Sequence, residues 1–102
     1  MAILMRLIQQ YDPRHKAEFH ALEKQFAELE VRGLLPRGQR SVPISAKEPA
    51  NTIVWECRFE SMSAVEKALN QIEVSPEHTE LGKKQHPMFQ QSWTELYEIL
   101  DY

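Results

Sequence analysis

The chain has 102 residues, 42% of them hydrophobic and 26% charged, and its 12 basic and 15 acidic side chains give a formal net charge of −3. This length suffices for one ordinary core, so we expect a single domain over residues 1–102. The composition is that of a globular protein, since disordered chains have fewer apolar residues and a larger net charge. The negative charge argues against nucleic-acid binding, which depends on clustered Lys and Arg.

Neither a membrane span nor a disulfide is expected. No apolar run approaches the ~18–20 residues that a span requires. Residues 1–8 are largely apolar, but Arg6 interrupts them, no basic segment precedes them and no small-residue cleavage site follows, so they are interpreted as a strand. The single cysteine, Cys57, cannot form an intrachain disulfide and favours a reducing compartment. We therefore expect a cytoplasmic protein.

The first half of the chain predicts a strand, a helix and an edge strand. The apolar run over residues 3–8 is typical of a strand covered on both faces. Asp12 is a good N-cap and Pro13 suits the first helical position, so a helix begins here and ends near Gly33. Residues 39–44 have moderate strand character, but their proline cannot donate to a central ladder, which indicates an edge strand.

The predicted first helix has one apolar stripe. Its members are spaced four, three, four and three residues apart, and the charged residues are expected to lie elsewhere on the helix. The stripe comprises His15, Phe19, Leu22, Phe26 and Leu29, whereas Lys16, Glu23, Lys24 and Glu30 fall outside it. Arg37 and Arg40, which follow the helix, are expected to keep a sheet edge soluble.

The second half predicts a strand, two helices and a final strand. Residues 53–60 alternate with a period of two, which is the clearest strand signal in the chain. Ser63-x-x-Glu66 resembles a capping box at the start of the second helix. Ser75-Pro76-Glu77 predicts a short helix that runs to about Gln85 and ends before Pro87. Residues 93–100 are rich in aromatic and branched residues and form the last strand.

This order predicts an α+β, ferredoxin-like β-α-β-β-α-β fold with a four-stranded antiparallel sheet and an extra short helix before the last strand. The first and third strands lie in the centre, and both long helices pack on one face of the sheet. Ile3, Met5 and Leu7 occupy one parity of the first strand, and Leu4 and Ile8 occupy the other. Because helices cover one face only, a second copy of the sheet is expected to cover the other, giving a homodimer.

Two segments resemble the dimeric alpha-beta barrel superfamily. The stretch Thr52–Ser61 leading into Met62–Leu69 is similar to the strand-to-helix step common there, and Pro87–Phe89 followed by Glu95–Leu100 is similar to NIPSNAP-like and related small barrel proteins. The resemblance covers nearly the whole chain in element order and implies ferredoxin-like subunits that pair sheet to sheet. That superfamily includes small monooxygenases, haem-degrading enzymes, isomerases and proteins without a known activity, so the resemblance implies a fold more than a reaction.

Two residues are the catalytic candidates. His15 extends the apolar stripe into the first turn of the helix, beside the end of the first strand, where Tyr11 lies. A polar pair there could line a cleft between helix and sheet and contact an anionic ligand near the helix N-terminus. The alternative is that His15 hydrogen-bonds locally at the edge of the core. His20 and His78 are expected at the surface.

Four further residues are candidates for ligand binding. His86 could reach the same region from the loop before the last strand, although loop histidines are mostly solvated. Aromatic side chains supply apolar area for a pocket wall, although in a domain this small most of them must serve the core. These aromatic candidates are Trp55, Trp93 and Tyr97.

No cofactor is expected. The sequence lacks HExxH, CxxC and paired histidines at helical spacing, so no metal ligand set or haem ligand can be assigned. Nucleophile elbows and glycine-rich phosphate loops are also missing.

Two functions remain open. One is a small cofactor-independent enzyme, of oxygenase or isomerase type, that holds a small molecule between helices and sheet. The other is a non-catalytic dimeric binding or stress-associated module. A cavity of a few hundred Å³ in the helix–sheet space would favour the first.

Overall fold

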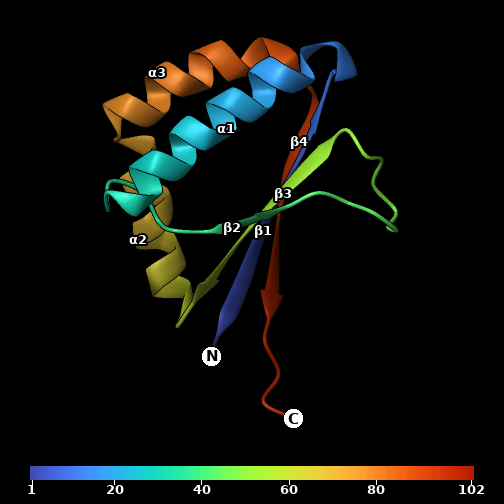
Figure 1. Ribbon diagram of the computed structural model, residues 1–102. Coiled ribbons are helices and arrows are strands. Elements are labelled where there is room, and N and C mark those ends of the chain that lie inside the picture. Colours follow the sequence, from blue (N-terminus) through green and yellow to red (C-terminus); the bar gives the residue numbers. More distant parts are fainter.

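The computed structural model describes residues 1–102 and contains one antiparallel sheet with its helices on one face (Figure 1). The strands are β1 (Ile3–Tyr11), β2 (Gln39–Ser41), β3 (Thr52–Phe59) and β4 (Phe89–Glu98), in the spatial order β2-β3-β1-β4. The helices are α1 (Lys16–Val31), α2 (Met62–Glu73) and α3 (Pro76–Gln85), with short 3-10 turns η1 (Pro13–His15) and η2 (His86–Met88). The predicted ferredoxin-like order, with β1 and β3 in the centre, is confirmed.

Local capping explains where the helices begin and end. The Asp12 side chain accepts a hydrogen bond from the backbone N–H of Arg14, and the first turn that follows is 3-10 rather than α-helical. After α1, Gly33 has a φ of 79°, a left-handed conformation that costs glycine little, and its N–H donates to the carbonyl of Glu30. Ser75 caps α3 by accepting from the N–H of His78, as its sequence predicts.

Several predicted boundaries were wrong, among them the end of β1, which runs to Tyr11 instead of stopping at residue 8. Helix α2 is capped by Ser61, whose hydroxyl accepts from the N–H of Ala64, and the box beginning at Ser63 lies inside the helix. Strand β2 ends at Ser41 because Pro43 offers no N–H to the ladder. Strand β4 begins at Phe89, earlier than predicted, since the polar residues before Trp93 also pair with β1.

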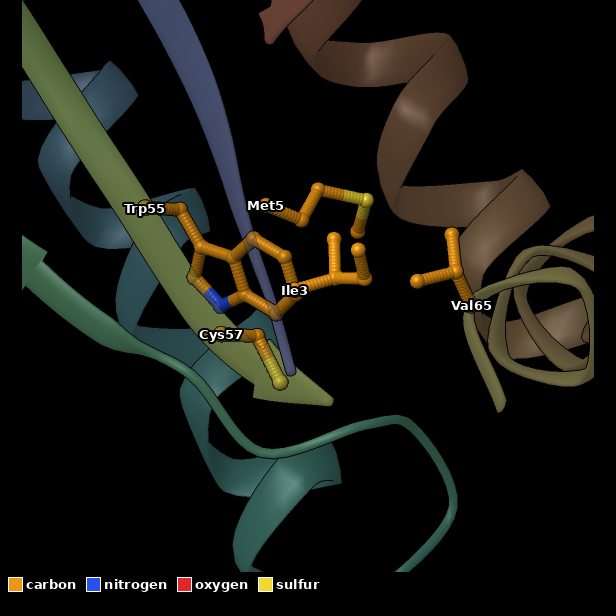
Figure 2. Close-up of a cluster of buried hydrophobic side chains, with 5 residues drawn as sticks. All are labelled: Ile3, Met5, Trp55, Cys57 and Val65. Carbon is orange, nitrogen blue, oxygen red and sulfur yellow. The ribbon is translucent and has the colours of Figure 1, made fainter. Parts of the chain in front are cut away.

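The register of the sheet places alternate residues on its two faces. Ile3, Met5 and Leu7 face the helices, and Phe59, Cys57 and Trp55 lie opposite them on β3. Figure 2 shows Val65 of α2 directed toward Ile3 and Met5, with Trp55 and Cys57 on the neighbouring strand. This cluster holds α2 against the sheet. None of the helices has both the length and the apolar character needed to cross a membrane.

The second face of the sheet carries no helix. The connection from β2 to β3 runs on this side in Figure 1, and its Ile44 is fully exposed. Arg6 crosses the face, with its guanidinium 3.3 Å from a carboxylate oxygen of Glu56 on one side and 3.3 Å from one of Glu95 on the other. Ile8 is buried even in the single chain. The uncovered face is therefore more polar than the apolar parities of β1 predict.

Candidate functional site

A cavity of about 260 Å³ lies between the helices and the sheet. We call it the helix–sheet cavity. Its apolar wall comes from both layers, with side chains of the central strands facing those of the helices and of the loop after α1. The main apolar residues are Met5, Leu7, Phe26, Leu35, Trp55 and Ile72. Leu69 and Thr94 also line the cavity and are exposed, so it opens to solvent beside α2 and β4.

Buried and half-buried polar side chains also line this cavity. They come from every layer: β1 supplies one amide, α1 two carboxylates, β2 a guanidinium, and α3 an imidazole and a second amide. The set is Gln9, Glu23, Glu30, Arg40, His78 and Gln85. Apolar walls with a few convergent polar groups are the usual composition of a small-molecule site.

Glu23 is the centre of this polar set. Its side chain is only 5% exposed, and it accepts hydrogen bonds from three donor side chains. Its Oε1 accepts from Gln9 Nε2 at 2.8 Å and from Arg40 Nε at 3.2 Å, and its Oε2 accepts from Gln85 Nε2 at 2.9 Å. A carboxylate accepts hydrogen bonds and donates none, so the three donor side chains match Glu23.

Glu30 forms the second half of the same network and lies about two helical turns after Glu23 on the same face of α1. Arg40 donates to both of its oxygens, through Nη1 at 3.2 Å and Nη2 at 2.7 Å, in a bidentate pair. Its Oε1 also accepts from the backbone N–H of Gly38 and from Trp55 Nε1, at 3.0 and 3.3 Å. Burial lowers the pKa of Arg40, but the bonds to Glu30 and the charges of both glutamates outweigh it, so the guanidinium pKa is raised. Arg40 is therefore a permanent cation within the site.

Sequence reasoning placed these residues wrongly. Glu23 and Glu30 were expected off the buried face of α1, and Arg40 was expected to solubilise a sheet edge. The structure buries both carboxylates and turns Arg40 toward them, because Arg40 pairs with Trp55 in the register of β2 and β3 and so shares its helix-facing side. The signal lay in the spacing: Glu23 follows Phe19 by four residues and Glu30 follows Phe26 by four, which places all of them on adjoining positions of one face.

His78 is the one titratable group of the cavity whose side chain has no hydrogen-bond partner. It was expected at the surface, but it is half-buried at the start of α3, with its ring centroid 5.1 Å from that of Phe26. Burial lowers its pKa below the ordinary value of 6.5, and the charge of Glu23 partly opposes that shift. A neutral imidazole at pH 7 can accept a proton or a hydrogen bond from a bound molecule.

The structure brings only one of the sequence-predicted site residues to this cavity, and that residue is Trp55. Tyr11 is 1% exposed and stacks on Phe19, with ring centroids 4.6 Å apart, and its hydroxyl lies 3.3 Å from Nε2 of His20 rather than beside His15. Burial raises its pKa above 10.0. Nδ1 of His15 lies 3.8 Å from a carboxylate oxygen of Glu18 and has no hydrogen-bond partner.

The remaining candidates lie elsewhere. His86 is exposed after the end of α3. Trp93 and Tyr97 lie on the face of the sheet that carries no helix, where both donate to Glu95, Trp93 through Nε1 at 2.9 Å and Tyr97 through its hydroxyl at 2.8 Å. Nowhere do three or more His, Cys, Asp or Glu side chains lie together so that they could hold a metal ion. The roles assigned to these residues stay predictions.

Solved structures share this fold along almost the whole chain. A NIPSNAP family protein from Agrobacterium tumefaciens superposes with a TM-score of 0.81 at 10% identity, over 99% of this chain and 88% of its own. An uncharacterized NIPSNAP-like domain protein from Burkholderia xenovorans gives 0.79 at 16% identity, over 99% and 87% of the two chains. A putative antibiotic biosynthesis monooxygenase from Caulobacter crescentus gives 0.71 at 15% identity, over 98% and 91%.

These similarities are similarities of fold. No protein-family model matches the chain, and no curated protein matches its sequence. The resemblance to NIPSNAP-like small barrel proteins that the sequence predicted is confirmed at this level. Because one fold supports many reactions, the function has to be argued from the cavity itself.

Proposed function

We propose that the protein binds a small, largely apolar molecule in the helix–sheet cavity and catalyses a proton transfer on it without a cofactor. The observation that carries the proposal is the cavity of about 260 Å³ with His78, neutral and unpaired, in its wall. An imidazole of lowered pKa is suited to remove a proton near pH 7. The charge of Glu23 would stabilise the imidazolium that forms.

An isomerase-type reaction needs a base of this kind and no oxidant or cofactor. His78 would take a proton from a carbon next to a carbonyl group, and the same imidazolium would return it to a different atom of the substrate. An oxygenase-type reaction would begin with the same proton removal, with dioxygen then required as the oxidant. We favour the isomerase type, because the cavity residues supply both of its steps.

Binding can be tested with Trp55 as the reporter. The variant Trp93→Phe leaves Trp55, in the cavity wall, as the sole tryptophan. We expect small uncharged aromatic ketones and alcohols to change its fluorescence and to raise the melting temperature. Leu69→Phe should weaken this binding about tenfold or more, because it fills the cavity. Leu96→Phe is the matched control, since Leu96 is exposed to the same degree, 47% against 46%, and does not line the cavity.

Catalysis is tested by exchange of substrate protons for deuterium. Ketones that bind are incubated with the protein in D₂O, and the loss of carbon-bound protons is followed by NMR. His78→Asn should retain binding and lose the exchange. Binding without exchange in the unaltered protein would contradict the enzymatic proposal and favour the non-catalytic binding module.

A homodimer through the uncovered sheet face is part of this proposal. The face has no helix over it, and it exposes Tyr97 together with half-buried Leu4 and Trp93. A sheet-to-sheet contact of this kind should bury more than about 1,200 Å² in total. Sedimentation equilibrium at roughly 10–50 μM, a range suited to ordinary dimer affinities, tests it. Monomer alone at these concentrations would refute it.

We also propose a cytoplasmic location. The support is Cys57, which is unpaired and buried, with Sγ 3.2 Å from the carbonyl oxygen of Arg37. Burial and the charge of Glu30 raise the pKa of this thiol, so it stays protonated and unreactive. Fractionation of cells that express the tagged protein measures the location directly.

A further inference from the structure

The orientation of two buried amides fixes what the helix–sheet cavity offers to a ligand. Gln9 and Gln85 are each 4% exposed, and both donate through Nε2 to the carboxylate of Glu23. Because an ionised carboxylate accepts only, each amide must turn its NH₂ group toward it and its carbonyl oxygen away. Neither oxygen accepts a hydrogen bond from the chain, and neither is sealed from the space around it.

The cavity therefore offers a bound molecule several hydrogen-bond acceptors and few hydrogen-bond donors. The polar N–H groups of Arg40 and Trp55 that face this region are directed at the two glutamates. The amide oxygens of Gln9 and Gln85 are two unpartnered acceptors, and neutral His78 provides a further one. A bound molecule that donates hydrogen bonds to this set is favoured over one that does not, since a buried acceptor without a donor costs stability.

The charge of the lining points to the same kind of ligand. Two glutamates and one arginine line the cavity, which gives 1 − 2 = −1 while His78 is neutral. In a partly buried site this charge attracts a cation and repels an anion far more strongly than it would in water. Trp55 and Phe26 add aromatic surface, which also favours a nearby cation.

We infer that the cavity selects a small primary ammonium compound with an apolar body, whose N–H groups donate to the amide oxygens of Gln9 and Gln85. The inference rests on the proposed function, because it names the substrate class of the same cavity. An ammonium group has three donors and no acceptor, which complements two unpartnered carbonyl oxygens in a lining of net negative charge. The apolar body lies against Met5 and Trp55, and a substrate of this class would also carry a carbonyl group next to the carbon from which His78 takes the proton.

The test compares three probes that share a phenyl body. 2-Phenylethylamine, 2-phenylethanol and 3-phenylpropionate are titrated into the full chain at pH 7.5 by calorimetry. We expect the amine to bind at least about tenfold more tightly than the alcohol, because charge-assisted hydrogen bonds are roughly twice as strong as neutral ones. The carboxylate should bind more weakly than the alcohol. Equal binding of amine and alcohol, or preference for the carboxylate, would overturn the inference.

A variant pair tests whether the charge of Glu23 sets the preference. Glu23→Gln should bring the ratio of amine to alcohol affinity close to one, whereas Glu28→Gln, an exposed position on the same helix, should leave the ratio unchanged. An unchanged ratio in folded Glu23→Gln would contradict the inference. If this variant does not fold, the three-probe comparison on the unaltered chain decides alone.

Failure of the inference and failure of the proposed function give different results. If the alcohol binds and Leu69→Phe weakens it, but the amine has no advantage, the cavity is a binding site and the ammonium selectivity is refuted. If neither the three probes nor the uncharged ketones bind, both the proposed function and the inference are refuted.

Discussion

Arg40 Nη2 donates to Glu30 Oε2 across 2.7 Å and so joins the edge strand β2 to the helix α1. The same guanidinium reaches Glu23 through Nε, which places one cation between two buried carboxylates. Strand β2 has only three residues, so its ladder with β3 contributes few hydrogen bonds. We conclude that this ion pair, as much as the ladder, holds the sheet edge against the helix layer and closes that side of the cavity.

Loss of this cation should be strongly destabilising. Arg40→Met leaves Glu23 and Glu30 buried and facing each other without a counter-charge, so we expect the free energy of unfolding to fall by about 3–5 kcal/mol. Chemical denaturation measures the change. Arg37→Met is the control, because Arg37 is exposed and makes no ion pair, and it should change stability by less than about 0.5 kcal/mol. A similar small effect at both positions would show that the network does not stabilise the fold.

Gly38 should tolerate no side chain. A Cβ built on this residue would overlap Cε2 and Nε1 of Trp55, and the indole cannot move without losing its bond to Glu30. We expect Gly38→Ala to cost about 1–3 kcal/mol of stability. Gly82→Ala is a matched control: it lies within α3 with nothing near its Cβ position, and should stabilise by about 0.5–1 kcal/mol. Thermal melts of the two variants would move in opposite directions.

The fold could be predicted because its signals are local. The Asp12-Pro13 turn, the stop at Gly33 and the Ser75-Pro76 cap each determine a boundary within a few residues of sequence, and the alternation in β3 gives its faces directly. Boundaries were wrong where competing caps lie close together, as at Ser61 and Ser63, where polar residues pair in a strand, and where Pro43 ends the ladder of β2 early.

The site could not be predicted in the same way. Glu23, Arg40 and Gln85 come from three elements, and each alone is a polar residue of the kind that usually lies at the surface. Their convergence depends on the register between β2 and β3 and on how α3 crosses α1, neither of which a local pattern specifies. His15 and Tyr11 illustrate the opposite case: the space beside Tyr11 is filled by Phe19 and His20, and the side chain of His15 is 40% exposed.

Asp12, the N-cap of η1, should have an unusually low pKa. Hydrogen bonds from the side chain and the backbone N–H of Arg14 lower the pKa of Asp12 from 3.8 to about 2. Because the folded-state pKa is depressed, the stabilisation is present above pH 3.8 and is lost as the pH falls toward 2. Arg14→Met should raise the pKa of Asp12 toward 3.8, as followed by the NMR shift of its carboxyl carbon. An unaltered pKa in this variant would show that Arg14 is not the cause.

His78 should make the free energy of unfolding depend on pH below about 6.5. Its folded-state pKa lies below 6.5 because burial disfavours the imidazolium, so both states are neutral above pH 6.5 and no stability is lost there. As the pH falls below 6.5, the unfolded chain takes up a proton that the folded chain refuses, and the free energy of unfolding decreases until the folded-state pKa is reached. Glu23 and Glu30 on α1 and Arg40 on β2 are the charged groups in the same cavity. His78→Phe removes this titration, so the unfolding free energy of the variant should fall less between pH 7.5 and pH 5 than that of the unaltered chain.

Denaturant melts at both pH values give the difference, and the NMR titration of the His78 ring gives its pKa. A His78 pKa at or above 6.5, or equal pH dependence in the two proteins, would mean that the imidazole is solvated and is not the neutral base that the cavity requires.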